Sequence, residues 1–421
     1  MSTSSFMEKL LDGVEVEWTK LWEVTTWDKK FNSVDRVKQP KVNNYPYLLA
    51  AELFKLERKE GDVFLLSTGE NTGWTTKDLA GKYLCSGEVV TIPWGKSRPV
   101  KDVLKYYKGD FITADNRIAT SKNTKKLSNK FLYYWMMSNA DAIDRLYRGS
   151  GIKHPHMAEL LDMDIPIPPI HIQEEIVRIL NTFTELTDEL TDELTARKKQ
   201  YNYYRNQLLT FAEDEVEWKT LGEVAKNSYS GGTPKAGNPE YYENGNIPWL
   251  RTQEVVFSDI LDTDIKITPS ALKNSAAKWI PKDCVIIAIS GATAGRSAIN
   301  KIPLTTNQHC CCLEIDHNMA LYRYVFHWVS SKYDNLKCLG QGARGDLNSE
   351  IIKNFKLPIP YPQNPKKSLI EQARIVAILD KFNTLTTSIS EGLPREIELR
   401  QKQYEYYRNL LLSFPKEKVE A

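Results

Sequence analysis

The strongest constraint on the fold of this chain is an internal repeat with a period of about 200 residues. The stretch RKKQYNYYRNQLLTF at 197–211 returns as RQKQYEYYRNLLLSF at 400–414, with 11 of 15 positions identical. VEWTKLWEV at 16–24 likewise returns as VEWKTLGEV at 216–224. The residues after Phe414 resemble those after Phe211, so the end of the chain leads back to its beginning. We therefore expect two equivalent halves in a pseudo-two-fold symmetric arrangement.

Each half ends in a long amphipathic segment. Apolar residues recur every three or four positions from Ile172 to Phe211, with an extra step of four near Leu190. This spacing is a heptad seam with a stutter and predicts a helix of about 40 residues, about 60 Å long. The second helical region is four residues longer and contains Gly392 and Pro394, where we expect a break and a new helix. Two equivalent seams favour antiparallel packing of the helices.

The segments between these helices differ in composition. They are rich in Gly, Pro, Asn, Thr and aromatic residues, with β-like runs such as 89–92 and 285–289. Each also holds a helical stretch, at 130–147 and at 321–336. The predicted fold class is α+β: two related α+β domains separated by two long helices that pack as an antiparallel coiled coil. The expected boundaries are 1–168 (first domain), 169–214 (first helical spacer), 215–360 (second domain) and 361–421 (second helical spacer).

Charge and cysteine usage narrow the class of protein. The net charge of +2 does not by itself indicate a nucleic-acid-binding protein. Residues 171–215 hold 5 basic and 10 acidic residues, so any DNA contact should come from the flanking domains. Six cysteines, three of them consecutive at 310–312, fit a reducing compartment and a buried strand, and no spacing indicates a metal site. Without a signal peptide or membrane-spanning run, we expect a soluble, cytoplasmic protein.

The repeated segments resemble those of a known family. RKKQYNYYRNQLL and RQKQYEYYRNLLL are similar to conserved segments of the specificity subunits of Type I restriction-modification enzymes, as are GGTPKAGNPEYYENGNIPWL at 231–250, TNQH at 306–309 and TTWDKKFN at 25–32. The resemblance covers essentially the whole chain. It implies that each domain is a target-recognition domain that reads one half of a bipartite, asymmetric DNA sequence. It also implies that the helices set the gap between the two halves.

The resemblance further implies a division of labour among subunits. The helices are expected to bind two DNA adenine methyltransferase subunits, and two restriction and translocation subunits complete the assembly. The chain itself would bind no cofactor, because S-adenosylmethionine, ATP and magnesium belong to the partners. We accordingly expect no catalytic residue and no metal ligand in this chain.

Candidate DNA contacts are polar residues in Gly-, Ser- and Asn-rich segments, because Arg, Gln and Asn read base edges and Lys mostly binds phosphate. In the first domain they are Lys96, Arg98, Arg117, Lys122, Lys125, Lys126, Arg148 and Lys153. In the second domain they are Arg251, Gln253, Arg296, Asn307, Gln308, Gln341 and Arg344. For any one of them the alternative is an ordinary solvated side chain. For Asn307 and Gln308 the alternative is a structural turn that caps the cysteine strand.

The helices carry repeated aromatic and leucine positions that we predict to form subunit interfaces. These are Tyr201, Tyr204, Leu208, Tyr404, Tyr407 and Leu411. Their helical spacing favours packing against a partner helix or a methyltransferase over base stacking.

The alternatives to DNA recognition are an enzyme and a scaffold protein. The segment GATAGRS at 291–297 superficially resembles the phosphate-binding loop of an enzyme. It lacks the lysine and the spacing of such a loop, so it does not support an enzymatic function. The alternative function is a coiled-coil scaffold or adaptor that does not bind DNA, and such a protein would show no salt-dependent DNA binding.

Overall fold

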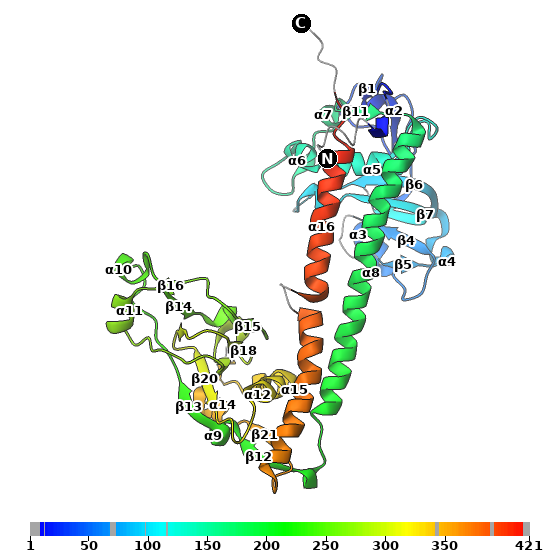
Figure 1. Cartoon of the computed structure of the whole chain (residues 1–421). Coiled ribbons are helices and arrows are strands. Elements are labelled where there is room, and N and C mark those ends of the chain that lie inside the picture. The colour runs from blue at the N-terminus through cyan, green and yellow to red at the C-terminus, as the bar shows by residue number, and fades with distance from the viewer. Residues whose placement is uncertain are drawn as a thin grey trace. The chain divides into compact units, whose positions relative to one another are not determined.

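The chain forms two compact units, each with one globular domain and parts of the long helices (Figure 1). The computed structural model describes residues 9–11, 13–67, 73–96, 98–114, 117–341, 345–387 and 391–415. Unit 1 combines Met1–Asp188 with Leu399–Ala421, and unit 2 is Glu189–Glu398. Both halves of the sequence repeat therefore fold into units made of the same kinds of element.

The domain of unit 1 is built on a mixed sheet with the strand order β2–β8–β6–β7–β4–β5. Neighbours are antiparallel except β4, which runs parallel to β7, as does the additional strand β3. The strands are β2 (Thr25–Trp27), β3 (Tyr47–Leu48), β4 (Val63–Leu66), β5 (Trp74–Thr75), β6 (Cys85–Ile92), β7 (Lys105–Ala114) and β8 (Arg117–Ser121). The run expected to be a strand at 89–92 is the buried end of β6.

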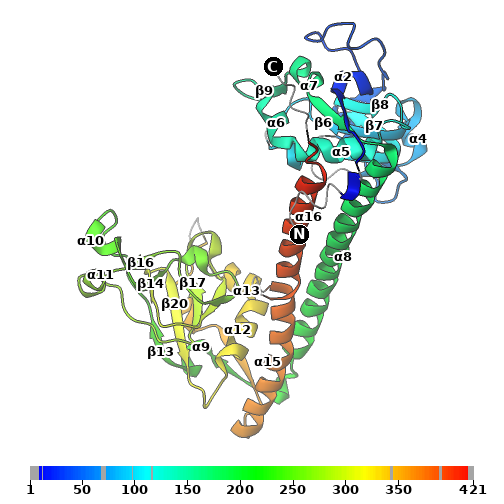
Figure 2. The same ribbon diagram turned by 45° about the horizontal axis from the view of Figure 1, so that its top comes forward.

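Helix α5 (Asn129–Ser138) packs between this sheet and α8 (Figure 2). Phe131 and Trp135 of α5 share one core with Val90 of β6 and Ile176 of α8. The remaining helices and strands of this domain are β1 (Glu17–Lys20), α2 (Leu21–Val24), α3 (Ala50–Lys55), α4 (Lys77–Ala80), α6 (Ala140–Arg145), β9 (Tyr147–Arg148), β10 (His154–Pro155), α7 (Met157–Leu161) and β11 (Asp164–Ile167). Strand β11 pairs with β1 and leads directly into α8.

The domain of unit 2 has the same core topology. Its main sheet has the order β13–β20–β17–β18–β15, again with antiparallel neighbours except for the parallel pair β15–β18. The elements are β12 (Val216–Thr220), α9 (Leu221–Val224), β13 (Ala225–Tyr229), α10 (Pro239–Tyr242), β14 (Ile247–Leu250), β15 (Asp259–Ile260), β16 (Lys266–Ile267), α11 (Pro269–Lys273), β17 (Val285–Ala288), β18 (Ser297–Asn300), β19 (Thr305–Thr306), β20 (Cys310–Ile315), α12 (Tyr322–Ser331), α13 (Tyr333–Cys338), α14 (Ser349–Lys353) and β21 (Lys356–Pro360). The cysteine run is a buried strand, as predicted.

The long helices match the periodicity of the sequence. Helix α8 (Ile170–Leu208) has 39 residues and contributes its first part to unit 1 and the remainder to unit 2. In unit 1 it runs antiparallel to α16 (Gly392–Leu411), and the Phe183 ring stacks on Tyr407 with 5.2 Å between centroids. In unit 2 it runs antiparallel to α15 (Pro365–Thr387), where Phe382 stacks on Tyr204 at 5.6 Å. The prediction of antiparallel helix packing is confirmed.

The break expected at Gly392 lies between α15 and α16. Gly392 has a φ of +79°, in the left-handed region that favours glycine. A Cβ at this position would lie 2.5 Å from the carbonyl oxygen of Thr384. Glycine is therefore required here by both the backbone angle and the close approach, and Pro394 follows in the first turn of α16, as expected.

One buried glutamine in each unit ties the domain to its long helix. Ser128, the N-cap of α5, donates its backbone N–H to Oε1 of Gln173 at 2.9 Å. In unit 2, Leu321 before α12 donates in the same way to Gln372, also at 2.9 Å. Neither glutamine is exposed. Each side chain satisfies a helix-terminal N–H that has no partner within its own helix.

Two of the three expected domain boundaries fall between elements, and the 214/215 boundary falls within the short 3-10 helix η3 (Glu213–Glu215). The 168/169 boundary lies between β11 and α8, and the 360/361 boundary lies between β21 and α15. The compact units divide the chain differently, because the core of unit 1 includes Leu411 and Phe414 from the C-terminal helix segment. The boundaries expected from the sequence thus separate globular domains from long helices. The compact units instead group segments that share a hydrophobic core.

Candidate nucleic-acid interface

Three candidate lysines of unit 1 lie in the turn between β8 and α5. Lys122 donates to the Trp22 carbonyl at 2.8 Å, and Lys126 pairs with Glu17 at 2.8 Å. Lys125 is exposed, and for its ammonium no partner is found in the part of the chain that the structure describes. All three side chains are exposed, and an exposed ion pair such as Lys126–Glu17 is weak, so these lysines can contact phosphate at little energetic cost.

A second group of unit 1 candidates surrounds the β9–β10 hairpin. Lys96 forms an isolated antiparallel β-bridge with Lys153. Its ammonium group pairs with Asp144 and lies 4.8 Å from the centre of the Tyr147 ring. Only 10% of the Lys96 side chain is exposed, so its contacts are structural in this arrangement. Lys153 is exposed, and Arg148 is 61% exposed while pairing with Glu159 at 2.6 Å. Arg98 is also exposed.

Arg117 of β8 is held differently from these surface cations. Its guanidinium lies 5.2 Å from the Phe31 ring centre and 5.9 Å from that of Trp94. Its Nε and Nη1 atoms are buried without a hydrogen-bond partner among the described residues. Burial lowers the pKa of Arg117 and raises that of the neighbouring Asp28 to about 6. The two aromatic rings therefore fix the orientation of this guanidinium.

Two further residues of this surface were not among the sequence candidates. Trp94 is 44% exposed and packs on the ring of His154, with 4.3 Å between centroids. The Trp94 carbonyl is 2.9 Å from Nδ1 of His154. The aromatic residue in PWGK at 93–96 was the available sequence signal, because aromatic side chains in loops can stack on bases.

In unit 2, Arg251 and Gln253 lie at the end of β14 and in the turn that follows. Arg251 is 28% exposed and lies 3.5 Å from Glu254 and 3.3 Å from Asp264. Gln253 is exposed. Arg296, between β17 and β18, has its guanidinium 5.9 Å from the centre of the Phe257 ring. Of these three, Gln253 has the most accessible side chain.

Asn307 and Gln308 separate into a structural and an exposed residue. Asn307 is 9% exposed, and its Oδ1 accepts the backbone N–H of His309 at 3.0 Å. This contact forms the turn before the cysteine strand, which was the structural alternative. Gln308 is exposed, and its Oε1 accepts from Thr233 at 2.7 Å. Gln341 is exposed and pairs through its backbone with Asp346, whereas Arg344 lies outside the described residues.

The candidate interface residues of the helices mostly pack inside each unit. Leu411 is fully buried, and Leu208 and Tyr201 pack against the core of unit 2. Tyr404 and Tyr407 pack against the core of unit 1. Tyr204 keeps 39% of its surface exposed while stacking on Phe382. These residues therefore account for the packing of the helices within each unit.

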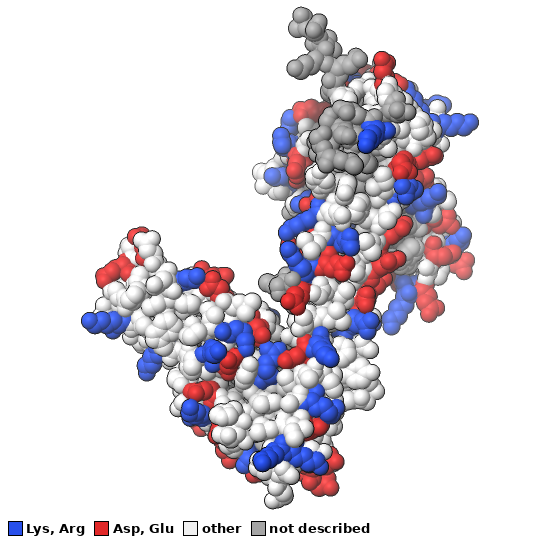
Figure 3. Space-filling model, viewed as in Figure 1, with Lys and Arg blue, Asp and Glu red and all other residues white. Residues whose placement is uncertain are grey.

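Charge is distributed evenly on the face shown in Figure 3, where Lys and Arg side chains alternate with Asp and Glu over both units. Within the described residues, no cluster of His, Cys, Asp and Glu has the arrangement of a metal site. No described helix is long and apolar enough to span a bilayer. On this face no patch of a single charge sign stands out, so the candidate nucleic-acid contacts there are local groups of each domain.

The two repeated halves of the chain match one family model. The model of the Type I restriction modification DNA specificity domain matches residues 34–197 and again 213–399, once in each half. The chain belongs to this family and is a specificity subunit of a Type I restriction-modification system, which recognises DNA sequence through its two domains.

Relatives and solved structures agree with this assignment. The chain is 38% identical to the Type I restriction enzyme EcoR124I/EcoR124II specificity subunit of Escherichia coli, over 99% of this chain and 98% of the relative. It is 32% identical to the putative specificity subunit S.HindORF215P of Haemophilus influenzae, over 97% and 98% of the two chains. The crystal structure of a Type-I restriction-modification S subunit from M. genitalium has the same fold, with a TM-score of 0.61, 17% identity and coverage of 96% and 98%.

Proposed function

We propose that each unit reads one half of a bipartite, asymmetric DNA target and that the helices set the gap between the halves. The main support is the contrast between shared topology and different side chains. The hairpin β9–β10 of unit 1 and the Gln341–Asp346 bridge of unit 2 follow equivalent helices, yet they carry Arg148 and Lys153 in one case and Gln341 in the other. Equal scaffolds with unequal polar groups fit two readers of different sequences.

The candidates other than Lys96 and Asn307 supply the proposed contacts. In unit 1 we assign phosphate contacts to Lys122, Lys125, Lys126 and Lys153, and base contacts to Arg98, Arg117 and Arg148. In unit 2 we assign base contacts to Arg251, Gln253, Arg296, Gln308, Gln341 and Arg344. The geometry favours structural roles for Lys96 and Asn307, and it adds Trp94 as a stacking residue of unit 1.

Mapping of N6-methyladenine tests this proposal. The chain is co-expressed with its methyltransferase subunit in a host without adenine methylation, and the modified sites are sequenced. We expect a single bipartite motif with a fixed gap. Arg98→Ala with Arg148→Ala should relax only one half of the motif, and Gln308→Ala with Gln341→Ala only the other. A continuous motif, or relaxation of both halves by either pair, would contradict the assignment. An adaptor without DNA affinity would yield no motif and no salt-dependent binding.

The same proposal assigns the helices to two copies of the methyltransferase. Lys199, Tyr203 and Asn206 of α8 are exposed, and they recur as Lys402, Tyr406 and Asn409 of α16. The spacing of four and three residues places each trio, here called the outward row, on one helix face. Tyr203 and Tyr406 are 59% and 54% exposed. Packing within the chain explains why the inner tyrosines of the helices repeat, but it does not explain the repetition of these exposed residues. Binding of the same partner at both places would explain it.

The partners would supply the chemistry of the complex. In this division the methyltransferase subunits use S-adenosylmethionine to methylate adenine at N6. Two restriction and translocation subunits use ATP and magnesium to move and cut unmodified DNA. The chain contributes sequence reading and no catalytic group.

The gap is proposed to depend on helix length. At 1.5 Å per residue, the 39 residues of α8 extend about 58 Å. Inserting four residues near Leu190 adds about 6 Å, which is close to two base-pair steps. The mapped motif should then keep both half-sites and change only the number of bases between them. An unchanged gap would contradict the role of the helices as a ruler.

A further inference from the structure

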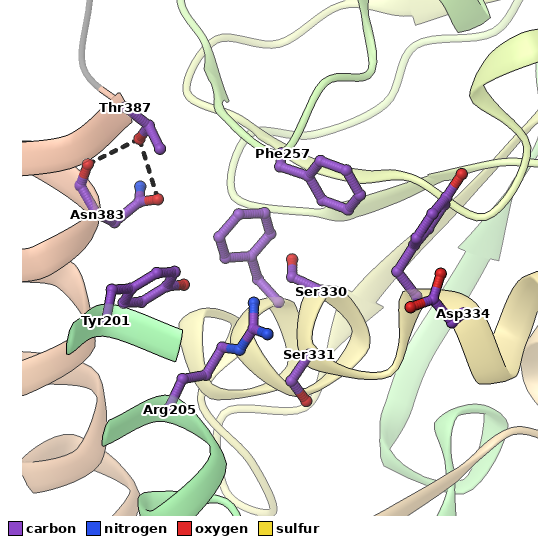
Figure 4. Close-up of a pocket in the computed structure, with 10 residues that line it drawn as sticks. Tyr201, Arg205, Phe257, Ser330, Ser331, Asp334, Asn383 and Thr387 are labelled. Atoms are coloured by element: carbon purple, nitrogen blue, oxygen red, sulfur yellow. Dashed lines mark hydrogen bonds between the residues drawn. The ribbon is translucent and has the colours of Figure 1, made fainter. Parts of the chain in front are cut away.

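Each unit contains a cavity at the same position of the repeat. In unit 2 a cavity of about 330 Å³ lies between α8, α12 and the end of α15, with the Arg205 side chain directed into it beside Tyr201 (Figure 4). In unit 1 a cavity of about 530 Å³ lies between α16 and the junction of α5 with α6, lined by Arg408 and Tyr404. These are the repeat equivalents of Arg205 and Tyr201.

The walls of the two cavities have diverged, but this Tyr–Arg pair has not. Ala140 and Met137 line the cavity of unit 1 where Tyr333 and Ser330 line that of unit 2. An aspartate also recurs, as Asp141 and Asp334, and it has a local structural reason because each lies in the first turn of a short helix. Each arginine contacts its own tyrosine, but it forms no ion pair with an acidic side chain among the described residues.

Both arginines are held in the same way and lack an ionic partner. Each guanidinium lies 5.4 Å from the ring centre of the tyrosine four residues earlier. The Nε atoms of Arg205 and Arg408 are buried without a hydrogen-bond partner, and no carboxylate of the described chain forms an ion pair with either residue. A guanidinium fixed on an aromatic face presents its edge for planar, bidentate acceptors. A buried donor left unpaired is unfavourable, so an external acceptor would stabilise each site.

We propose that these twin cavities each receive a carboxylate side chain from one of the two methyltransferase subunits. This inference rests on the proposed function, in which one partner binds the chain twice. A Tyr–Arg pair that recurs in two otherwise diverged cavities fits two copies of the same ligand. In unit 1 the cavity also borders the outward row, because Asn409 belongs to both.

The surroundings favour a protein carboxylate over a DNA phosphate. Asp334 and Asp141 line the same cavities, and a phosphodiester has no donor to offer them. A protein segment can pair a carboxylate with the arginine and a nearby N–H with the aspartate.

Native mass spectrometry and titration of the full chain with its methyltransferase subunit test the inference. The variants are Arg205→Gln, Arg408→Gln and the double variant. Arg197→Gln and Arg400→Gln are matched controls, since they lie in the same repeated helix segments but do not line the cavities. We expect two methyltransferases on the unaltered chain and on the controls. Each single variant should weaken one of the two binding steps by about 30-fold or more, and the double variant both.

Folding and DNA binding separate the other outcomes. Hydrogen exchange of α5 and α12 shows whether a variant has lost its fold, and Arg205→Lys, which keeps the charge but loses the bidentate edge, should bind with intermediate affinity. Normal binding of two methyltransferases by the folded double variant overturns the inference and leaves the proposed function intact. Weaker DNA binding with unchanged methyltransferase affinity overturns it in favour of a phosphate contact. If the unaltered chain binds no methyltransferase, the proposed function itself fails.

Discussion

Units 1 and 2 attach their domains to the same helix system with different chemistry. In unit 1, the Tyr134 hydroxyl of α5 donates to Oδ1 of Asn181 at 2.7 Å. The equivalent pair in unit 2 is His327 of α12 and Asp380 of α15, also separated by 2.7 Å. Arg323 joins this second pair by donating to Asp380 at 2.7 Å and to Asp259 at 2.8 Å. A neutral contact in one unit is therefore a charged network in the other.

This difference contrasts with the parts that stay equal in the two units. The buried glutamines Gln173 and Gln372 make the same contact, and the stacked rings of Phe183–Tyr407 and Phe382–Tyr204 recur. The pairing of the helices and the glutamine contact with each domain are therefore the same in both units. The Tyr134–Asn181 and His327–Asp380 contacts differ between the units, as expected if the two domains read different sequences.

Removing one charge from the unit 2 network should give the largest effect. Asp380→Ala leaves Arg323 with Asp259 only and leaves Nε2 of the buried His327 without its partner. We expect a loss of about 3 kcal/mol in the stability of unit 2, at the low end for a broken buried pair because 32% of the Asp380 side chain is exposed. The matched variant Asn181→Ala should cost unit 1 about 1 kcal/mol.

Urea unfolding followed by hydrogen exchange in α12 and α5 measures the two losses separately. Equal losses in the two units would mean that the charged network contributes no more than the neutral hydrogen bond.

Acidification should shift the two units in opposite directions. Burial lowers the pKa of His327, and hydrogen bonds from His327 and Arg323 outweigh burial to lower the pKa of Asp380. The unfolded state then binds more protons than the folded state, so unit 2 loses stability as pH falls below about 6.5, the ordinary pKa of His. Burial instead raises the pKa of Asp28 in unit 1 from 3.8 to about 6. There the folded state binds more protons, so unit 1 gains stability between pH 6 and pH 4.

The gain in unit 1 is at most about 3 kcal/mol, at about 1.4 kcal/mol per pKa unit. Pulse proteolysis of the full chain at pH 7, 6 and 5 reports which unit is cleaved first. Asp28→Asn should abolish the gain in unit 1 without altering the acid sensitivity of unit 2. A parallel loss in both units at pH 5 would show that the network and Asp28 do not control the response.

The buried glutamines should contribute equally to the stability of the two units. Gln173→Leu and Gln372→Leu each remove the acceptor of a helix-terminal N–H and a donor to a backbone carbonyl. We expect a loss of about 2 kcal/mol from each unit, since a buried N–H is left unpaired. Thermal unfolding of both variants provides the comparison. A loss confined to one unit would show that the shared contact is not equivalent.

Sequence periodicity predicted the helices and the strand character of the domains, because these depend on neighbours three, four or two residues apart. It could not predict strand order, since β4 pairs with β7 across more than 40 residues. Gln173 and Gln372 repeat in sequence, but a polar residue on an apolar seam has no local sign of its distant partner. For the same reason Lys96 was predicted to be a DNA contact, although Asp144 pairs with it from another part of the chain.

The smallest effect should come from the stacked rings that pair the helices. Tyr407→Leu and Tyr204→Leu keep apolar volume on the seam but remove the aromatic pairs with Phe183 and Phe382, whose rings are inclined by 18° and 23°. Such pairs contribute about 0.5–1.5 kcal/mol beyond the area they bury, so each variant should lose about 1 kcal/mol. Because the two stacks are equivalent, the two losses should agree within experimental error when measured by urea unfolding. A clearly larger loss for Tyr204, which is 39% exposed, would mean that the two halves of the helix system are no longer interchangeable.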